Sequence, residues 1–184
     1  MLIDRARAGD QIAFGRLIDL HQRTVYRTAL AALGTHEDAE DAAQDAFIQA
    51  WRHLPGFRGD AAFKTWLLTI VWRKALDRRR SRLLWWTRRA PVTLGQDIFS
   101  EIETGAPSPE RAALASDEAR RVRKEISKLS PTLRDTLLLI SSGEHSYEEA
   151  AAILGAPLGT VKWRVAEARR RIAKRMESCD RTSI

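Results

Sequence analysis

Apolar residues along this chain recur at steps of three and four, which is the spacing of one face of an α-helix. One such stretch covers residues 10–33 and stops at Gly34, a residue type that favours helix C-termini. Two more helices are expected over residues 35–54, before Pro55, and over residues 61–86. No segment alternates convincingly as a strand would. The pattern therefore predicts an all-α fold with three or more helices in each half of the chain.

The helix expected over residues 35–54 has two different faces. Thr35 precedes it and Asp38 follows three residues later, which predicts a variant of the capping box at its start. Its apolar stripe would face the core and consists of Ala39, Ala43, Phe47, Ala50 and Leu54. Its acidic residues lie on another face, namely Asp38, Asp41 and Asp45.

The C-terminal half has the pattern of a helix-turn-helix. Ser146 and Glu149 form a capping box that begins a short helix, and Gly155 ends it. One face of this helix is expected to carry Tyr147, Ala150, Ala151 and Leu154. A tight connection over residues 156–159 leads into a second helix, whose buried stripe is predicted to be Val161, Val165, Ala168 and Ile172. Such a second helix can enter the major groove of duplex DNA.

The face opposite that stripe is polar and mostly basic. Arginines can bind guanine edges, lysine or threonine can bind phosphate, and Glu167 can accept a hydrogen bond from cytosine while repelling phosphate. The predicted DNA-binding residues are Thr160, Lys162, Trp163, Arg164, Glu167, Arg170 and Arg171. From the spacing alone, the solvated basic face of an ordinary helical hairpin is the less favoured alternative.

The charge of the chain favours a nucleic-acid partner. Its 184 residues include 31 Lys and Arg against 24 Asp and Glu, which gives a net charge of +7 and a pI of about 10.2. Residues 61–91 are strongly basic, whereas residues 92–118 are acidic and interrupted by proline and glycine. We therefore predict two small domains, at residues 1–86 and 111–184, joined by a flexible linker over residues 87–110. A long loop inside a single domain is the alternative.

The sequence lacks the residue patterns of disulfide frameworks, metal sites and catalytic sites. Cys179 is the sole cysteine and the four histidines have no metal-ligand spacing, so no disulfide framework, metal or cofactor is expected. We find no nucleophile paired with a base and no glycine-rich phosphate loop; His145 adjoins Ser146, but capping accounts for Ser146. With no apolar run of membrane-spanning length and no signal-like N-terminus, a cytoplasmic protein without membrane insertion is expected.

Two separate blocks of residues resemble the extracytoplasmic-function group of bacterial sigma factors, the smallest promoter-recognition subunits of RNA polymerase. The first block matches the family's second conserved region and consists of DAEDAAQDAF at 38–47, Trp51, FRG at 57–59 and FKTWL at 63–67. The second matches the fourth region and consists of LSP at 129–131, LR at 133–134, SYEEAA at 146–151, LG at 154–155 and GTVK at 159–162. The resemblance covers almost the whole chain. It implies a promoter-specificity subunit without catalytic chemistry; a stand-alone helix-turn-helix regulator is the alternative.

The resemblance also implies partners. Core RNA polymerase would bind the acidic helix, through clamp helices of its largest subunit that contact Asp38, Asp41, Gln44 and Asp45. A carboxylate row at steps of three and four offers acceptors to a basic surface, although by itself it also fits a solvated helix face. The polymerase flap would contact the C-terminal domain, and the linker would pass near the active centre. A cognate anti-sigma factor is a further expected partner, and the adjacent Trp85 and Trp86 cannot both face the core.

Promoter DNA is the remaining partner that the resemblance implies. The loop over residues 55–62 would hold a flipped-out base of the minus-10 element, and Phe63 and Trp66 would help to separate the strands. Both rings also have core spacing, so we expect at least one to be buried. The predicted minus-10 and upstream contacts are Phe57, Arg58, Gly59, Asp60, Phe63, Lys64, Trp66, Arg73, Lys74 and Arg78. The chain departs from the family's usual residues at Arg73, Trp163 and Glu167.

Overall fold

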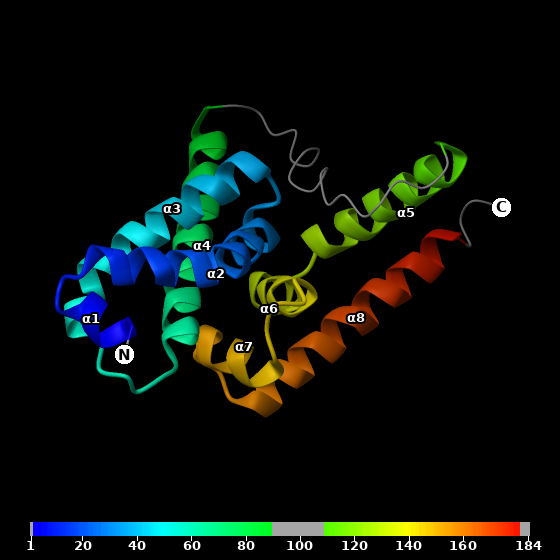
Figure 1. The fold of residues 1–184 in the computed structure, drawn as a ribbon. Coiled ribbons are helices and arrows are strands. Elements are labelled where there is room, and N and C mark those ends of the chain that lie inside the picture. The colour runs from blue at the N-terminus through cyan, green and yellow to red at the C-terminus, as the bar shows by residue number, and fades with distance from the viewer. Residues whose placement is uncertain (1, 90–108, 181–184) are drawn as a thin grey trace.

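The computed structural model describes residues 2–89 and 109–180, which contain helices and no strand (Figure 1). The helices are α1 (Leu2–Arg7), α2 (Gln11–Leu33), α3 (His36–His53), the 3-10 turn η1 (Leu54–Gly56), α4 (Phe63–Arg89), α5 (Pro109–Ser127), α6 (Pro131–Ser141), α7 (Tyr147–Leu154) and α8 (Leu158–Asp180). The all-α prediction is confirmed. Most of the predicted linker and the side chains of Trp85 and Trp86 lie outside the described part. In that described part, no helix has the length and apolar character needed to cross a membrane.

Helices α2, α3 and α4 pack on one another and form the core of the N-terminal half. The side chain of Asp10 caps α2 by accepting a hydrogen bond from the backbone N–H of Ala13 at 3.0 Å. The helix ends at Gly34, whose φ of 81° is left-handed and costs glycine little. On α3 the predicted apolar stripe lies inward, with Ala39 and Ala50 completely buried. The helices therefore begin, end and face the core largely where the pattern predicts.

Some local predictions differ from the structure. Thr35 occupies the N-cap of α3, but its hydroxyl donates to a carboxylate oxygen of Asp38 at 2.6 Å and makes no bond to the helix backbone. The face predicted for α7 omits Ile153, which is 4% exposed and belongs to the core. Helix α1 is absent from the predicted elements because its six residues are too few for a periodic signal.

The C-terminal half is a helix-turn-helix, as predicted. The hydroxyl of Ser146 accepts from the backbone N–H of Glu149 at 3.1 Å, and the Glu149 carboxylate accepts from the Ser146 N–H at 3.0 Å, which completes the capping box. Gly155 ends α7 in the left-handed conformation, and α8 follows after a short turn. One side of α8 packs on α6 around a buried cluster made of Leu129, Leu133, Leu137, Val165 and Ala168.

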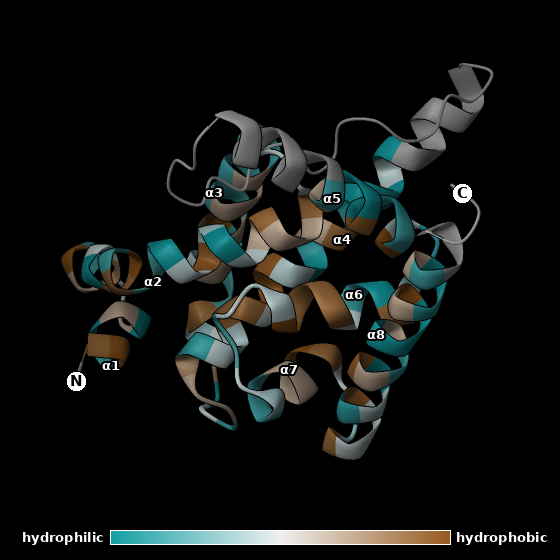
Figure 2. Ribbon diagram, turned by 90° about the vertical axis from the view of Figure 1, so that its right-hand side faces the viewer, coloured by the Kyte–Doolittle hydropathy of each residue, from teal (hydrophilic) through white to brown (hydrophobic). Residues whose placement is uncertain are grey.

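The two halves pack against each other. Helix α6 lies on α2, and α7 lies on α4. Leu139 of α6 and Ile153 of α7 belong to the same continuous core as Leu68 and Trp72 of α4. Apolar stretches of α4, α6 and α7 accordingly lie together near the centre of Figure 2. We call the contact of α6, α7 and residues 142–146 with α2 and α4 the interdomain interface.

His145 is buried at this interface. The Thr28 hydroxyl donates to the Thr24 carbonyl at 2.7 Å, so it accepts from Nε2–H of His145 at 3.0 Å. Nδ1 of His145 is buried and has no hydrogen-bond partner among the described residues. Burial lowers the pKa of His145, because an imidazolium at this position would lose its hydration. The carboxylates of Glu149 and Glu144 act in the opposite direction and raise this pKa.

We expect the free energy of unfolding to fall as the pH drops below about 6.5. His145 titrates near 6.5 when unfolded and at a lower pH when buried beside Lys64, so below that pH the unfolded chain binds more protons than the folded chain. Urea denaturation at about pH 7.5 and about pH 5.5 measures the effect in the wild type and in His145→Gln. Between these pH values, the free energy of unfolding should fall less in His145→Gln than in the wild type. An equal fall in both proteins would show that His145 does not cause the pH dependence.

Candidate polymerase and nucleic-acid interfaces

The carboxylates predicted to bind polymerase lie along α3, and α4 supplies cations to them. Asp41 accepts a hydrogen bond from Arg78 at 2.7 Å, and Asp45 lies 3.6 Å from the same guanidinium. Asp38 pairs with Arg82. The side chains of Asp41 and Asp45 are nevertheless 55% exposed, so they retain lone pairs for a partner. Arg78, predicted to contact DNA phosphates, here stabilises the acidic row.

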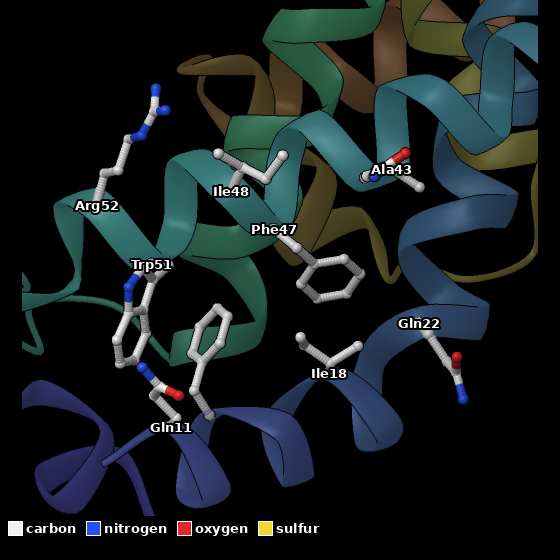
Figure 3. Close-up of a pocket in the computed structure, with 10 residues that line it drawn as sticks. Gln11, Ile18, Gln22, Ala43, Phe47, Ile48, Trp51 and Arg52 are labelled. Carbon is white, nitrogen blue, oxygen red and sulfur yellow. The ribbon is translucent and has the colours of Figure 1, made fainter. Parts of the chain in front are cut away.

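An apolar groove of about 730 Å³ opens beside this row, between α2 and α3 (Figure 3). Its apolar lining comes from Phe14, Ile18, Phe47, Ile48 and Trp51. Gln44, a predicted polymerase contact, also lines it, and Ile48 is 43% exposed. This groove is not apparent from the sequence, because two helices contribute to it and periodicity describes only one helix at a time. The partial exposure of several large apolar side chains at one place indicates a binding surface.

The aromatic residues assigned to the minus-10 element form a cluster. Phe57, Phe63 and Trp66 have ring centroids between 5.0 and 5.9 Å apart. Phe57 is 8% exposed and Phe63 is 6% exposed, whereas Trp66 is half-buried, so the expectation that at least one ring is buried is confirmed. A buried ring cannot stack on a base without leaving the core, which argues against direct DNA contact by Phe57 and Phe63 in this arrangement. In the neighbouring loop, the predicted DNA contacts Arg58, Gly59 and Asp60 are exposed.

The basic residues predicted for DNA contact on α4 have different surroundings. Arg73 is exposed, and Lys74 lies in a shallow depression with Asp45, Asp77 and Arg78. Lys64, at the start of the helix, donates to the Glu149 carboxylate at 2.9 Å across the interdomain interface. The structure therefore does not place all the predicted cations on one open surface.

The residues predicted for the minus-35 element lie along the outer side of α8. Lys162, Arg170 and Arg171 are exposed, and Trp163 is 61% exposed despite its size. Thr160, Arg164 and Glu167 are half-buried. A row of cations with an open aromatic ring suits contact with phosphates and with base edges or methyl groups.

Glu167 is held by two arginines of its own helix. Its carboxylate accepts from Nε and Nη2 of Arg170 at 2.8 and 2.9 Å, and from Nε of Arg171 at 2.6 Å. These hydrogen bonds, first from Arg170 and then from Arg171, lower the pKa of Glu167 to about 2. Glu167 is therefore ionised at neutral pH, and the predicted bond to a cytosine edge would compete with three existing bonds.

Comparison with known proteins agrees with this arrangement. The family model for Sigma-70 region 2 matches residues 17–90, and that for Sigma-70, region 4 matches residues 119–172. The RNA polymerase sigma-H factor of Pseudomonas aeruginosa is 34% identical, over 96% of this chain and 92% of that protein. The chain belongs to the sigma-70 family of RNA polymerase sigma factors. Its similarity to the ECF RNA polymerase sigma-E factor of Escherichia coli, 34% identical over 96% of this chain and 93% of that protein, supports membership in the extracytoplasmic-function group.

Solved structures give the same result. The sigma factor RpoE of Bartonella quintana, determined in complex with the anti-sigma factor NepR, is 26% identical with a TM-score of 0.65, covering 89% of this chain and 96% of that chain. This protein is therefore an alternative sigma factor, which binds core RNA polymerase and directs transcription initiation at promoters with minus-35 and minus-10 elements. The resemblance inferred from the sequence motifs is confirmed, and the alternative of a stand-alone regulator is not supported.

Proposed function

We propose that the outer face of α3 is the surface of this sigma factor that contacts the clamp helices of the polymerase. Asp38, Asp41 and Asp45 would accept hydrogen bonds from basic side chains of a partner helix. Gln44 and the neighbouring groove would receive the apolar side chains of the same helix. The exposed carboxylates and the exposed Ile48 next to them support this assignment, because a helix laid in the groove would cover both.

We assign minus-10 recognition to the surface loop over residues 58–60 and to Trp66. Arg73 and Lys74 would contact phosphates of the duplex upstream, a role that needs charge and not sequence-specific geometry. Phe57 and Phe63 would act as core residues that support the loop and Trp66 from below. This assignment revises the prediction from sequence, in which all three aromatic residues contact DNA.

We assign minus-35 recognition to the exposed side of α8, and the contact with the polymerase flap to the C-terminal half. The observation that carries this proposal is that Lys162, Trp163 and Arg170 stand exposed on the second helix of a complete helix-turn-helix. Lys162 and Thr160 would bind phosphate, and Arg164 would reach a base edge at the same end of the helix.

The three bonds that Glu167 accepts predict an effect on DNA affinity. In Glu167→Gln the two arginines lose their counter-charge, so about one more phosphate counterion should be released on binding. The affinity for a minus-35 duplex should rise by up to roughly eightfold at about 0.1 M salt, and the slope of log affinity against log salt should steepen by about 0.9. Fluorescence anisotropy across a salt series measures both. Glu148→Gln, an exposed carboxylate on α7, is the matched control. If Glu167→Gln instead bound the minus-35 duplex with lower affinity and lower sequence selectivity, Glu167 would contact a base.

We also propose a cognate anti-sigma factor, a cytoplasmic location and no catalytic reaction for this protein. Support for the first comes from the similarity to an RpoE that was determined with NepR bound. The groove and the acidic row on α3 would suit an inhibitor, since a protein bound there would exclude polymerase from the surface assigned to it.

A pull-down with sigma-free core polymerase, followed by run-off transcription on a pool of promoter fragments, tests the proposed function. Binding together with selective transcripts is the expected result, and the enriched fragments would identify the promoter sequences. Tight DNA binding by the chain alone, without polymerase binding, would contradict it.

A further inference from the structure

Trp163 is a large apolar side chain that the fold leaves open to solvent. Its exposed fraction is 61%, and it belongs to neither of the two buried clusters. Val161, Val165 and Ala168 form the packed side of the same helix, and each is at most 1% exposed. Because successive residues turn by about 100° around a helix axis, Trp163 lies nearly opposite this packed side. The core therefore gives no reason for an indole ring at this position.

Cations surround the exposed ring. Lys162 and Arg164 are its neighbours along the chain, and Arg170 lies two turns further along nearly the same face, with 66% of its side chain exposed. The carboxylate of Glu167, one turn after the ring, is already held by arginines of α8, so these charges remain positive in sum. A partner that covers the ring must also accept this positive charge, which favours duplex DNA over an apolar protein surface.

The position of Trp163 along α8 determines which part of the DNA it meets. The helix begins at Leu158, so Trp163 is its sixth residue and lies in the second turn. In a helix-turn-helix, the N-terminal residues of the second helix contact base edges in the major groove. The groove is about 12 Å wide and about 8.5 Å deep, and the side chain that points furthest from the domain core reaches deepest into it.

Base edges in the major groove offer an indole ring one apolar partner. Guanine, cytosine and adenine present hydrogen-bond donors and acceptors there, whereas thymine also presents its C5-methyl group. Stacking on a base would first require that a base step of the duplex be unstacked, which costs free energy. A contact between the ring and a methyl group instead removes apolar surface from water and leaves the duplex intact.

We propose that Trp163 is a specificity-determining residue of this sigma factor, which selects a thymine in the minus-35 element by packing its indole ring on the C5-methyl group. The proposal rests on the assignment of minus-35 recognition to α8. Lys162 would hold the helix on the phosphates, whereas Trp163 would distinguish thymine from cytosine, the pyrimidine that lacks the methyl group. Affinity and sequence selectivity would thus come from different side chains of one helical turn.

Deoxyuridine tests the proposal, because it pairs like thymidine and lacks only the methyl group. The probe is a duplex of a promoter enriched from the fragment pool, in which the thymines of the minus-35 element are replaced one at a time on either strand. Fluorescence anisotropy measures its affinity for the full chain assembled with core polymerase. At one position the replacement should weaken wild-type binding by roughly fourfold, the effect of withdrawing one methyl-sized apolar group from a contact. In Trp163→Ala the same replacement should have no effect.

Leu20→Ala is the matched control. It removes another large apolar side chain, which is 67% exposed on α2 and lies outside the surfaces assigned to DNA and polymerase. This control should show the full deoxyuridine effect of the wild type. Because Trp163 and Leu20 both lie outside the core, both variants should keep the helix content of the wild type, which circular dichroism checks.

Several results would overturn the methyl contact. They are wild-type binding that no deoxyuridine replacement weakens, a minus-35 element without thymine, and an equal deoxyuridine effect in the wild type and in Trp163→Ala. An indole N–H that donates to a base acceptor would give the first of these results. A loss of core-polymerase binding in Trp163→Ala would place the ring on the polymerase and also overturn the proposal. Failure of the proposed function has a different signature, in which replacing the whole minus-35 element leaves wild-type binding unchanged.

Discussion

Reversing the charge of the acidic row, in Asp41→Lys with Asp45→Lys, should weaken core-polymerase binding by roughly a hundredfold or more. Each close charge pair at a protein interface contributes on the order of 1.5 kcal/mol or more, and tenfold in affinity corresponds to about 1.4 kcal/mol. Both carboxylates are 55% exposed and point away from the core, so the fold should persist. Pull-down or surface plasmon resonance with sigma-free core polymerase measures the loss, and circular dichroism reports the helix content.

The new lysines would also face Arg78, which now pairs with both carboxylates. A control must therefore separate lost docking from a general change of charge. Asp19→Lys with Glu118→Lys reverses two exposed carboxylates that belong to none of the proposed surfaces. This control should bind polymerase almost as well as the wild type. Similar binding by both double variants would show that α3 does not dock on the clamp helices.

The double substitution Lys162→Ala with Arg164→Ala should reduce transcription from promoters that depend on a minus-35 element by roughly thirtyfold or more. A base-edge contact contributes about 1–3 kcal/mol, and the loss of one phosphate contact weakens binding by roughly eightfold at about 0.1 M salt. Both residues lie in the first turns of α8. Most of the binding to core polymerase should be retained, because the contact with the clamp helices is assigned to α3, which carries neither residue. Run-off transcription on matched templates with and without the minus-35 element measures the effect.

Lys124→Ala with Lys128→Ala removes the same charge from the C-terminal half, at exposed positions before α6. This control should retain most of its minus-35-dependent transcription. If Lys162→Ala with Arg164→Ala transcribed at the wild-type level, the assignment of minus-35 recognition to α8 would be wrong. An equal loss in both variants would mean that total charge, and not the position of these two residues, governs binding.

The helices of this protein could be predicted where their signals are local. Gly34 and the capping box of Ser146 and Glu149 act through backbone groups at most four residues away, so a short window of sequence contains the whole cause. The stripe of Val161, Val165 and Ala168 likewise depends only on spacing along α8. Thr35 shows the limit of this reasoning, because its hydroxyl could have accepted a hydrogen bond from a backbone N–H of the first turn, but it donates to the side chain of Asp38.

The candidate surfaces could be predicted only in part. The sequence placed the carboxylates Asp41 and Asp45 on one face of α3, but it could not show that Arg78, more than thirty residues later, would bind them. It also could not decide which aromatic side chains are buried, since Phe63 and Trp66 both fit the core spacing, yet Phe63 is buried and Trp66 is half-buried. Core and binding surface share the same residue types there, so periodicity alone cannot separate them.

Three conclusions follow from the amino-acid sequence alone: this protein is all-α, its C-terminal half is a helix-turn-helix, and it resembles a sigma factor. These conclusions rest on caps, on periodic apolar faces and on motifs, which are properties of neighbouring residues. The packing of the two halves on each other, through pairs such as Arg79 with Asp135, is visible in the three-dimensional structure and not in the sequence. Such pairs form between residues far apart along the chain, and whether they meet depends on how whole helices are oriented by the shared core.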